Sequence, residues 1–114
     1  MENCIFCKII NGEIPSNKVY EDDEILAFKD INPQMPVHIL IVPKKHFKSI
    51  MDISKEDELL IGKIFTVIQK IAKELGIDND GFRIISNCGE NAGQTVKHLH
   101  FHILAGKKMS DKII

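Results

Sequence analysis

Residues 98–104, His-Leu-His-Phe-His-Ile-Leu, alternate histidine with large apolar side chains. Successive side chains of a β-strand point to opposite faces of the sheet. The alternation therefore predicts a strand with its imidazoles on one face and with Leu99, Phe101 and Ile103 on the other. Burial of the apolar face in a core is favourable, because it removes apolar surface from water. This segment thus predicts a sheet that is packed on one side and carries a histidine site on the other.

Other apolar segments predict the elements around this strand. Short runs rich in β-forming residues occur at 18–20, 24–28, 38–42 and 81–86. A long helix is expected from Ser54, whose side chain can cap it, to Gly76, which ends it. Residues 4–11 predict a short apolar turn or helix. The predicted class is α+β, with an antiparallel sheet of about five strands, one long helix and a short N-terminal helix.

The predicted long helix carries an unusually wide apolar stripe. Its narrow part, at helical spacing, consists of Leu60, Ile64, Val67, Ile68, Ile71 and Leu75. Ile61, Phe65 and Ala72 widen this stripe beyond what one sheet face normally covers. The excess could pack under a loop of a monomer or against a second subunit, and we expect a homodimer.

Length and charge restrict the class of protein. A chain of 114 residues fits one domain, which we expect to span 1–114. Fifteen Lys and Arg against sixteen Asp and Glu give a net charge of −1, so we expect no binding to nucleic acid polymers. No segment reaches the ~20 apolar residues of a membrane span. Residues 1–4 are not a basic segment followed by a long apolar run, so we expect no secretion signal. A cytoplasmic protein that binds a small ligand is expected.

The three clustered histidines need a compensating partner, because aligned imidazolium groups repel one another. An anion is one candidate. Gly89 and Gly93 allow backbone N–H groups of the preceding loop to point at a phosphate, and Asn87 and Thr95 add side-chain donors. The alternative is a catalytic zinc held by all three histidines. By itself, such a glycine-rich loop could also be a simple hairpin connection.

Cysteines add a second cluster. Cys4 and Cys7 form a C-x-x-C, which inside cells indicates metal or redox chemistry rather than a disulfide framework. Cys88 stands alone.

The motif at residues 93–104 closely resembles the histidine-triad family, whose pattern is His-φ-His-φ-His-φ-φ with φ hydrophobic. The likeness extends over nearly the whole chain. It includes Ile5-Phe6, Ile9-Ile10, Glu13-Ile14-Pro15, Phe28-Lys29-Asp30-Ile31, Pro33-Gln34 and Val42-Pro43-Lys44-Lys45-His46. These segments are similar to the family's nucleoside phosphoramidase branch.

The resemblance implies a two-step reaction at the middle histidine of the motif. His100 would attack the phosphorus of a purine nucleoside phosphoramidate, and water would then hydrolyse the nucleotidyl-histidine. His102 would stabilise the phosphoryl oxygens or protonate the leaving group, and His38 would support the nucleophile from behind. Further donors to the phosphate would come from Asn87, Gly93, Gln94 and Thr95.

The resemblance also implies a nucleoside site. Asp30 would accept hydrogen bonds from the ribose hydroxyls. An apolar slot for the purine base would consist of Phe6, Ile9, Ile14, Phe28 and Ile31.

Cys4, Cys7, His46 and His98 match the zinc set of the C-x-x-C members of this family and of the related uridylyltransferases. Two thiolates and two imidazoles make a closed tetrahedral site, so the zinc would be structural. His98 would then not touch the substrate.

Two alternatives to the phosphoramidase function are left open. The first is hydrolysis of dinucleoside polyphosphates by the same His100, and the second is a noncatalytic nucleotide-binding scaffold. Residues 105–114 lack the aromatic, proline-rich ending of the best-known phosphoramidases of this family. The leaving group is therefore not determined by the sequence.

Overall fold

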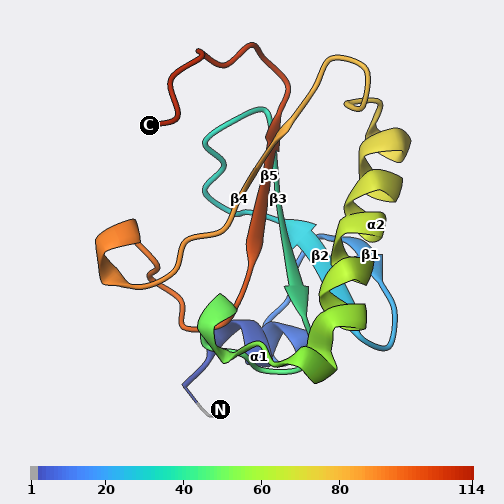
Figure 1. Ribbon diagram of the computed structural model, residues 1–114. Coiled ribbons are helices and arrows are strands. Elements are labelled where there is room, and N and C mark those ends of the chain that lie inside the picture. The colour runs from blue at the N-terminus through green and yellow to red at the C-terminus, as the bar shows by residue number, and fades with distance from the viewer. Residues whose placement is uncertain (1–2) are drawn as a thin grey trace.

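A computed structural model describes residues 3–114, so residues 1 and 2 of the expected domain lie outside the described residues (Figure 1). In chain order the elements are α1 (Ile5–Ile10), β1 (Lys18–Glu21), β2 (Ile25–Lys29), β3 (Val37–Pro43), α2 (Glu58–Leu75), β4 (Arg83–Ile85) and β5 (Phe101–Ala105). Short 3-10 turns occupy Ile50–Asp52, Lys55–Asp57 and Glu90–Ala92. The predicted α+β class, with one long and one short helix, is confirmed.

All the strands belong to one antiparallel sheet of five strands in the order β1-β2-β3-β5-β4. The central strand β3 pairs with β2 on one side and with β5 on the other, and it is buried along nearly its whole length. Its register places Leu40 opposite His102. The side chain of His38, two residues earlier, therefore lies on the same face of the sheet as His102.

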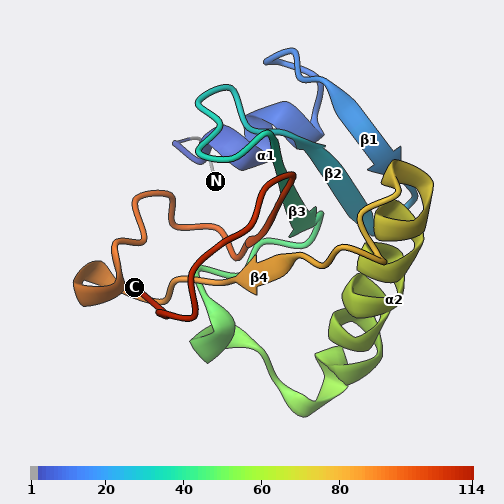
Figure 2. The same cartoon turned by 90° about the horizontal axis from the view of Figure 1, so that it is seen from above.

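The two helices cover opposite faces of the sheet, as Figure 2 shows. On the face covered by α2, Ile39, Ile41, Phe101 and Ile103 pack against the apolar side of that helix. On the other face, Phe6 and Ile9 of α1 pack against alternate residues of β2 and β3. The histidines lie on the α1 side.

Helix α2 begins later than Ser54, because its first turn is a 3-10 turn. The Asp57 carboxylate accepts hydrogen bonds from the Ser54 N–H at 2.9 Å and from the Ser54 hydroxyl at 3.0 Å. Gly76 ends the helix with a φ of 71°, a conformation that costs glycine little. Phe65 and Leu75, from the wide stripe, are 44% and 43% exposed in the single chain.

Strand β5 is shorter than the alternating motif, so the prediction of a strand from His98 was wrong. Leu99 N–H donates to Phe47 O at 2.7 Å, and His100 O accepts from Ser86 Oγ at 2.8 Å. These partners lie outside the ladder, and residues 98–100 form a segment without regular secondary structure before the strand. The alternation survives, because Leu99 belongs to the core under α2 whereas Phe6 of α1 contacts His98 and His100.

The other boundaries differ by a few residues. The predicted strand 81–86 is reduced to β4, the run 24–28 is shifted by one residue in β2, and the run 38–42 is longer by one residue at each end in β3. Among residues 3–114, no helix has both the length and the apolar composition needed to cross a bilayer.

Candidate active site and metal centre

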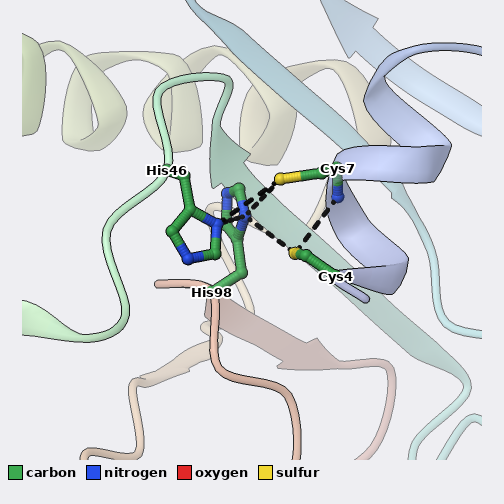
Figure 3. Close-up of side chains that lie close together, drawn as sticks. All are labelled: Cys4, Cys7, His46 and His98. Carbon is green, nitrogen blue, oxygen red and sulfur yellow. Dashed lines mark hydrogen bonds between the residues drawn. The ribbon is translucent and has the colours of Figure 1, made fainter. Parts of the chain in front are cut away.

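Four side chains from three segments meet between α1 and the start of the histidine motif (Figure 3). Cys4, the N-cap of α1, and Cys7, in its first turn, come from the helix. His46 follows β3, and His98 precedes β5. The ligand atoms of all four lie within 4.8 Å of one another. The structure thus brings together all four residues of the predicted metal set.

The separations between these atoms match the edges of a metal tetrahedron. His46 Nδ1 and His98 Nδ1 are 3.1 Å apart, Cys4 Sγ and His98 Nδ1 3.3 Å, and Cys7 Sγ and His46 Nδ1 3.4 Å. Zinc bonds of about 2.05 Å to nitrogen and 2.3 Å to sulfur give tetrahedral edges of about 3.3 Å (N–N) and 3.6 Å (N–S). Two thiolates and two imidazoles form a donor set that suits zinc. The cluster can hold a metal ion.

Hydrogen bonding prepares His98 as a ligand. Its ring is fully buried, and Nε2–H donates to Pro43 O at 2.8 Å. The proton of the neutral ring is therefore on Nε2, which leaves the Nδ1 lone pair directed at the cysteines. Burial lowers the pKa of His98 and so favours the neutral form that a metal needs.

His100 is held in the complementary tautomer. Its Nδ1–H donates to the backbone oxygen of His98 at 2.7 Å, so the lone pair is on Nε2. The ring is buried and lies edge-on to Phe6, with 5.0 Å between the ring centres. Burial also lowers the pKa of His100. The result is an uncharged imidazole with one nitrogen fixed and the other able to act as a nucleophile.

His102 is oriented by a chain of hydrogen bonds that starts at the backbone. Gln34 N–H donates to His38 Nδ1 at 3.1 Å, so neutral His38 carries its proton on Nε2. That Nε2–H donates to His102 Nδ1 at 2.9 Å. His102 must then carry its own proton on Nε2. Burial, together with the neighbouring His100 and His38, lowers the pKa of His102 to about 4.

His38 therefore contacts His102, rather than the nucleophile that it was expected to support. The reason is the register, which places His38 and His102 on adjacent strands and on one face. Asp30 Oδ2 lies 3.4 Å from His38 Nε2 and completes a second cluster of potential ligands. The Gln34 donor opposes metal binding there, because it keeps a proton on the His38 nitrogen that faces the cluster.

The three histidines of the motif do not converge on one metal. His98 faces the cysteines, His100 bonds to the His98 carbonyl, and His102 bonds to His38. The alternative of a catalytic zinc held by all three is therefore wrong.

Four of the five apolar residues predicted for the base slot lie together. Phe6, Ile9 and Phe28 are buried in one apolar cluster, and Ile14 packs against it. Ile31 is not part of this cluster, because it lies in the turn after β2 and is 88% exposed.

Gln94 is buried, and its side chain is used by the protein itself. The amide nitrogen donates to Lys48 O and Val96 O, and the amide oxygen accepts from Gly89 N–H. Its side chain thus holds the loop in place, and only its backbone N–H was expected to contribute to a phosphate site.

The backbone of this loop is also engaged. Gly93 N–H donates to Glu90 O at 2.9 Å, and Gln94 N–H donates to Gly89 O at 3.1 Å. The exposed Thr95 and the half-buried Asn87 lie at the two ends of the loop. These two side chains are the better candidates for contact with a ligand.

Sequence reasoning missed several residues that shape the site. Leu40 lies on the histidine face of β3, and its position two residues after His38 could have placed it there. Val96 packs against the same apolar cluster. Ser86, which bonds to His100 O, and Gln34, which orients His38, had no local sequence signal, because each acts through a backbone group that only the fold brings near.

Comparisons with known proteins agree with this geometry. A family model described as "HIT domain" matches residues 11–109, which exclude Cys4 and Cys7. Protein HitA of Neisseria gonorrhoeae is 49% identical over 91% of this chain and 96% of its own length. The purine nucleoside phosphoramidase of Escherichia coli K12 is 47% identical over 95% of this chain and 91% of its own length.

Solved structures resemble this chain over nearly its whole length. A histidine triad protein from Clostridium difficile has a TM-score of 0.95 at 60% identity and covers 98% of this chain and 97% of its own. A HIT family hydrolase from Clostridium thermocellum has a TM-score of 0.97 at 48% identity and covers 100% of this chain and 99% of its own.

Proposed function

The chain belongs to the HIT domain family, and on that premise we propose that it hydrolyses purine nucleoside 5′-phosphoramidates through a nucleotidyl-histidine on His100. The observation that carries the proposal is the tautomer of this ring. Its Nδ1–H is held by the His98 carbonyl at 2.7 Å, so Nε2 has a lone pair without any activating base. The similarity to a purine nucleoside phosphoramidase supports the choice of substrate.

In the first step, His100 Nε2 forms a bond to phosphorus while the phosphorus–nitrogen bond of the substrate breaks. The departing nitrogen takes a proton supplied by solvent and leaves as a neutral amine. In the second step, water attacks the same phosphorus and the bond to His100 breaks. The attacking water releases a proton to the solvent, which replaces the one taken up by the amine. The products are the nucleoside monophosphate and free His100.

His102 contributes a hydrogen bond rather than a charge. With Nδ1 occupied by His38, its Nε2–H can donate to a phosphoryl oxygen on which negative charge develops. A neutral His102 in this chain of bonds cannot give up its proton easily, because the His38 that donates to it is itself fixed by Gln34. We therefore assign it to stabilisation of the phosphoryl oxygens and not to protonation of the amine.

The nucleoside would lie against the α1 side of the sheet. Phe6, Ile9, Ile14 and Phe28 provide apolar contacts for the purine, with Leu40 at the base of this cluster. Asp30, with its side chain 20% exposed next to His38, can accept hydrogen bonds from the ribose hydroxyls. Asn87, Thr95 and, after rearrangement of the loop, the Gly93 backbone would contact the phosphate.

We assign the metal of the Cys4, Cys7, His46 and His98 cluster as a structural zinc. All four positions of the tetrahedron are taken by protein atoms, so none is open to substrate. Bound zinc would cross-link α1, the segment after β3 and the start of the histidine motif. Free thiols at such a site suit the reducing cytoplasm, where we expect the protein to act.

We also expect two copies to pair through the exposed part of the wide α2 stripe, which includes Phe65 and Leu75. The oligomeric state can be measured by sedimentation equilibrium.

A substrate comparison tests the proposal. Purified protein would be given adenosine 5′-phosphoramidate, a diadenosine polyphosphate and a sugar nucleotide, and kcat/KM would be measured for each. The proposal expects the phosphoramidate to be preferred, and protein quenched in alkali, where a phosphorus–imidazole bond survives, to carry a nucleotide on His100. Preference for the polyphosphate would favour a dinucleoside polyphosphate hydrolase, and binding without turnover of any substrate would favour a scaffold.

A further inference from the structure

Two contacts connect the metal cluster to the nucleophile. The first is His98, whose ring faces Cys4 and Cys7 and whose backbone oxygen holds His100 Nδ1 at 2.7 Å. The second is Phe6, which lies between the two cysteines in the chain. Its ring packs edge-on against both His98 and His100, at 6.0 and 5.0 Å between ring centres.

The two thiols can be reached from solvent. Cys4 and Cys7 are only partly buried, in contrast to the fully buried His98. Within the described residues, an open cavity of about 580 Å³ is lined by Cys7 and His46, and another of about 720 Å³ is lined by Cys4 and His46. A molecule as small as a peroxide fits either cavity.

We propose that Cys4 and Cys7, through the metal that they bind, keep His100 in position, and that peroxide oxidises both cysteines, releases the metal and lowers turnover. We call this arrangement of the two cysteines the clasp. The proposal rests on the proposed function for its effect on turnover. One thiolate attacks a peroxide oxygen, which breaks the O–O bond and leaves a sulfenic acid. The second thiolate attacks that sulfur, the S–S bond forms, and the S–O bond breaks. Two thiolates, one H₂O₂ and two protons give one disulfide and two waters.

The disulfide cannot keep the metal. A bond of about 2.05 Å between the sulfurs withdraws two of the four ligands and leaves only His46 and His98. The Cys4 thiolate also accepts the Cys7 N–H at the start of α1, and this capping bond is weakened when the sulfur moves. Both connections to His100 are then loosened, through His98 on one side and through Phe6 on the other.

The test uses the full-length, reduced, zinc-loaded protein and hydrogen peroxide. We expect zinc release, detected with a chromophoric chelator, in step with the loss of two hydrogen atoms from the protein mass. We expect kcat to fall about tenfold or more while KM changes less than twofold, as for other losses of residues that orient a reactive group. A dithiol reductant plus zinc should restore both. Loss of zinc with kcat unchanged, or full retention of zinc after oxidation, overturns the proposal.

Cys88→Ser is the matched control, because it removes the only other cysteine and leaves the clasp intact. It should respond to peroxide as the unmodified protein does, and resistance in this variant would overturn the proposal by assigning the effect to Cys88. The Cys4→Ser/Cys7→Ser variant should lack zinc and show no further response to peroxide. If this variant does not fold, the reversible oxidation of the natural sequence still decides the question.

A second readout does not depend on turnover. The ¹⁵N and ¹H signals of the His100 imidazole report the Nδ1–H bond to His98 and should change on oxidation. Unchanged signals after complete zinc release would contradict the coupling. If the reduced, zinc-loaded protein hydrolyses no phosphoramidate, the proposed function fails, whereas zinc release and the His100 signals still test the clasp.

Discussion

The imidazole of His100 is held by the backbone of His98, with 2.7 Å between His100 Nδ1 and His98 O. The same His98 directs its own ring away from His100, to the cysteines of α1. One residue of the motif therefore fixes the tautomer of the nucleophile through its carbonyl and can bind the metal through its side chain. The metal cluster and the nucleophile are connected through this residue.

Replacement of His100 with Asn or Ala should reduce kcat by about 10³-fold or more, because no other group can form the bond to phosphorus. Nucleotide binding, measured by calorimetry, should change little. Met51→Ala, at a 77% exposed position, serves as a control with normal turnover. Normal hydrolysis by the His100 variant would refute the assignment of the nucleophile.

Replacement of His38 with Phe should lower kcat by roughly 10- to 100-fold with a smaller effect on KM. The change removes the donor to His102 Nδ1, so His102 is no longer fixed with its proton on Nε2. The ¹⁵N spectrum of His102 should show mixed tautomers. If His102 keeps one tautomer in the variant, its orientation does not depend on His38.

Turnover should be insensitive to pH near neutrality. The pKa of His102 is lowered to about 4 by burial and by His100 and His38, against a smaller opposite effect of Asp30. We therefore expect kcat to be flat from roughly pH 5 to 8 and to fall only in more acid solution. An inflection in kcat near pH 6.5 would indicate that an unshifted histidine controls the reaction.

Stability should follow the same shift with a defined sign. In the unfolded chain His102 titrates near its ordinary value of 6.5, whereas in the native protein it stays neutral until about pH 4. Between these values the unfolded state binds more protons, so the free energy of unfolding decreases as pH falls from 6.5 to about 4. Urea titrations across this range measure the slope, which His102→Gln should reduce.

Removal of the metal should lower the melting temperature, because a ligand that binds only the native state stabilises it. A chelator should lower Tm by several degrees in the natural sequence and have no effect on Cys4→Ser/Cys7→Ser. Calorimetry with and without chelator provides the measurement. Equal melting temperatures with and without metal in the natural sequence would mean that the cluster does not contribute to stability.

Replacement of Gln94 with Ala should destabilise the protein by about 1–3 kcal/mol, since it removes the partner of three partly buried backbone groups, at Lys48, Gly89 and Val96. Gln69→Ala, on the exposed side of α2, is the matched control and should lie within about 0.5 kcal/mol of the natural sequence. Chemical unfolding of the two variants gives the comparison. Equal stabilities would show that the amide of Gln94 is dispensable.

The sequence by itself determined the secondary structure class and the two faces of the histidine segment. Both follow from local geometry: side chains of an extended chain alternate, and the apolar set must be buried. The sequence therefore predicted that Leu99 and His100 face opposite sides, even though β5 begins only at Phe101. The resemblance to a known family identified Cys4 and His46 as partners, which their spacing alone could not.

Only the tertiary structure decided what each imidazole does. His98, His100 and His102 are equivalent in the pattern, yet their rings have different partners. His98 faces the cysteines, His100 donates to a backbone carbonyl, and His102 accepts a hydrogen bond from His38. The tautomer of an imidazole depends on which donor or acceptor lies at each ring nitrogen. For His98 and His102 these partners are Pro43 and His38, which are remote in sequence and come into contact only in the folded sheet. The partner of His100 is the carbonyl of His98, only two residues earlier.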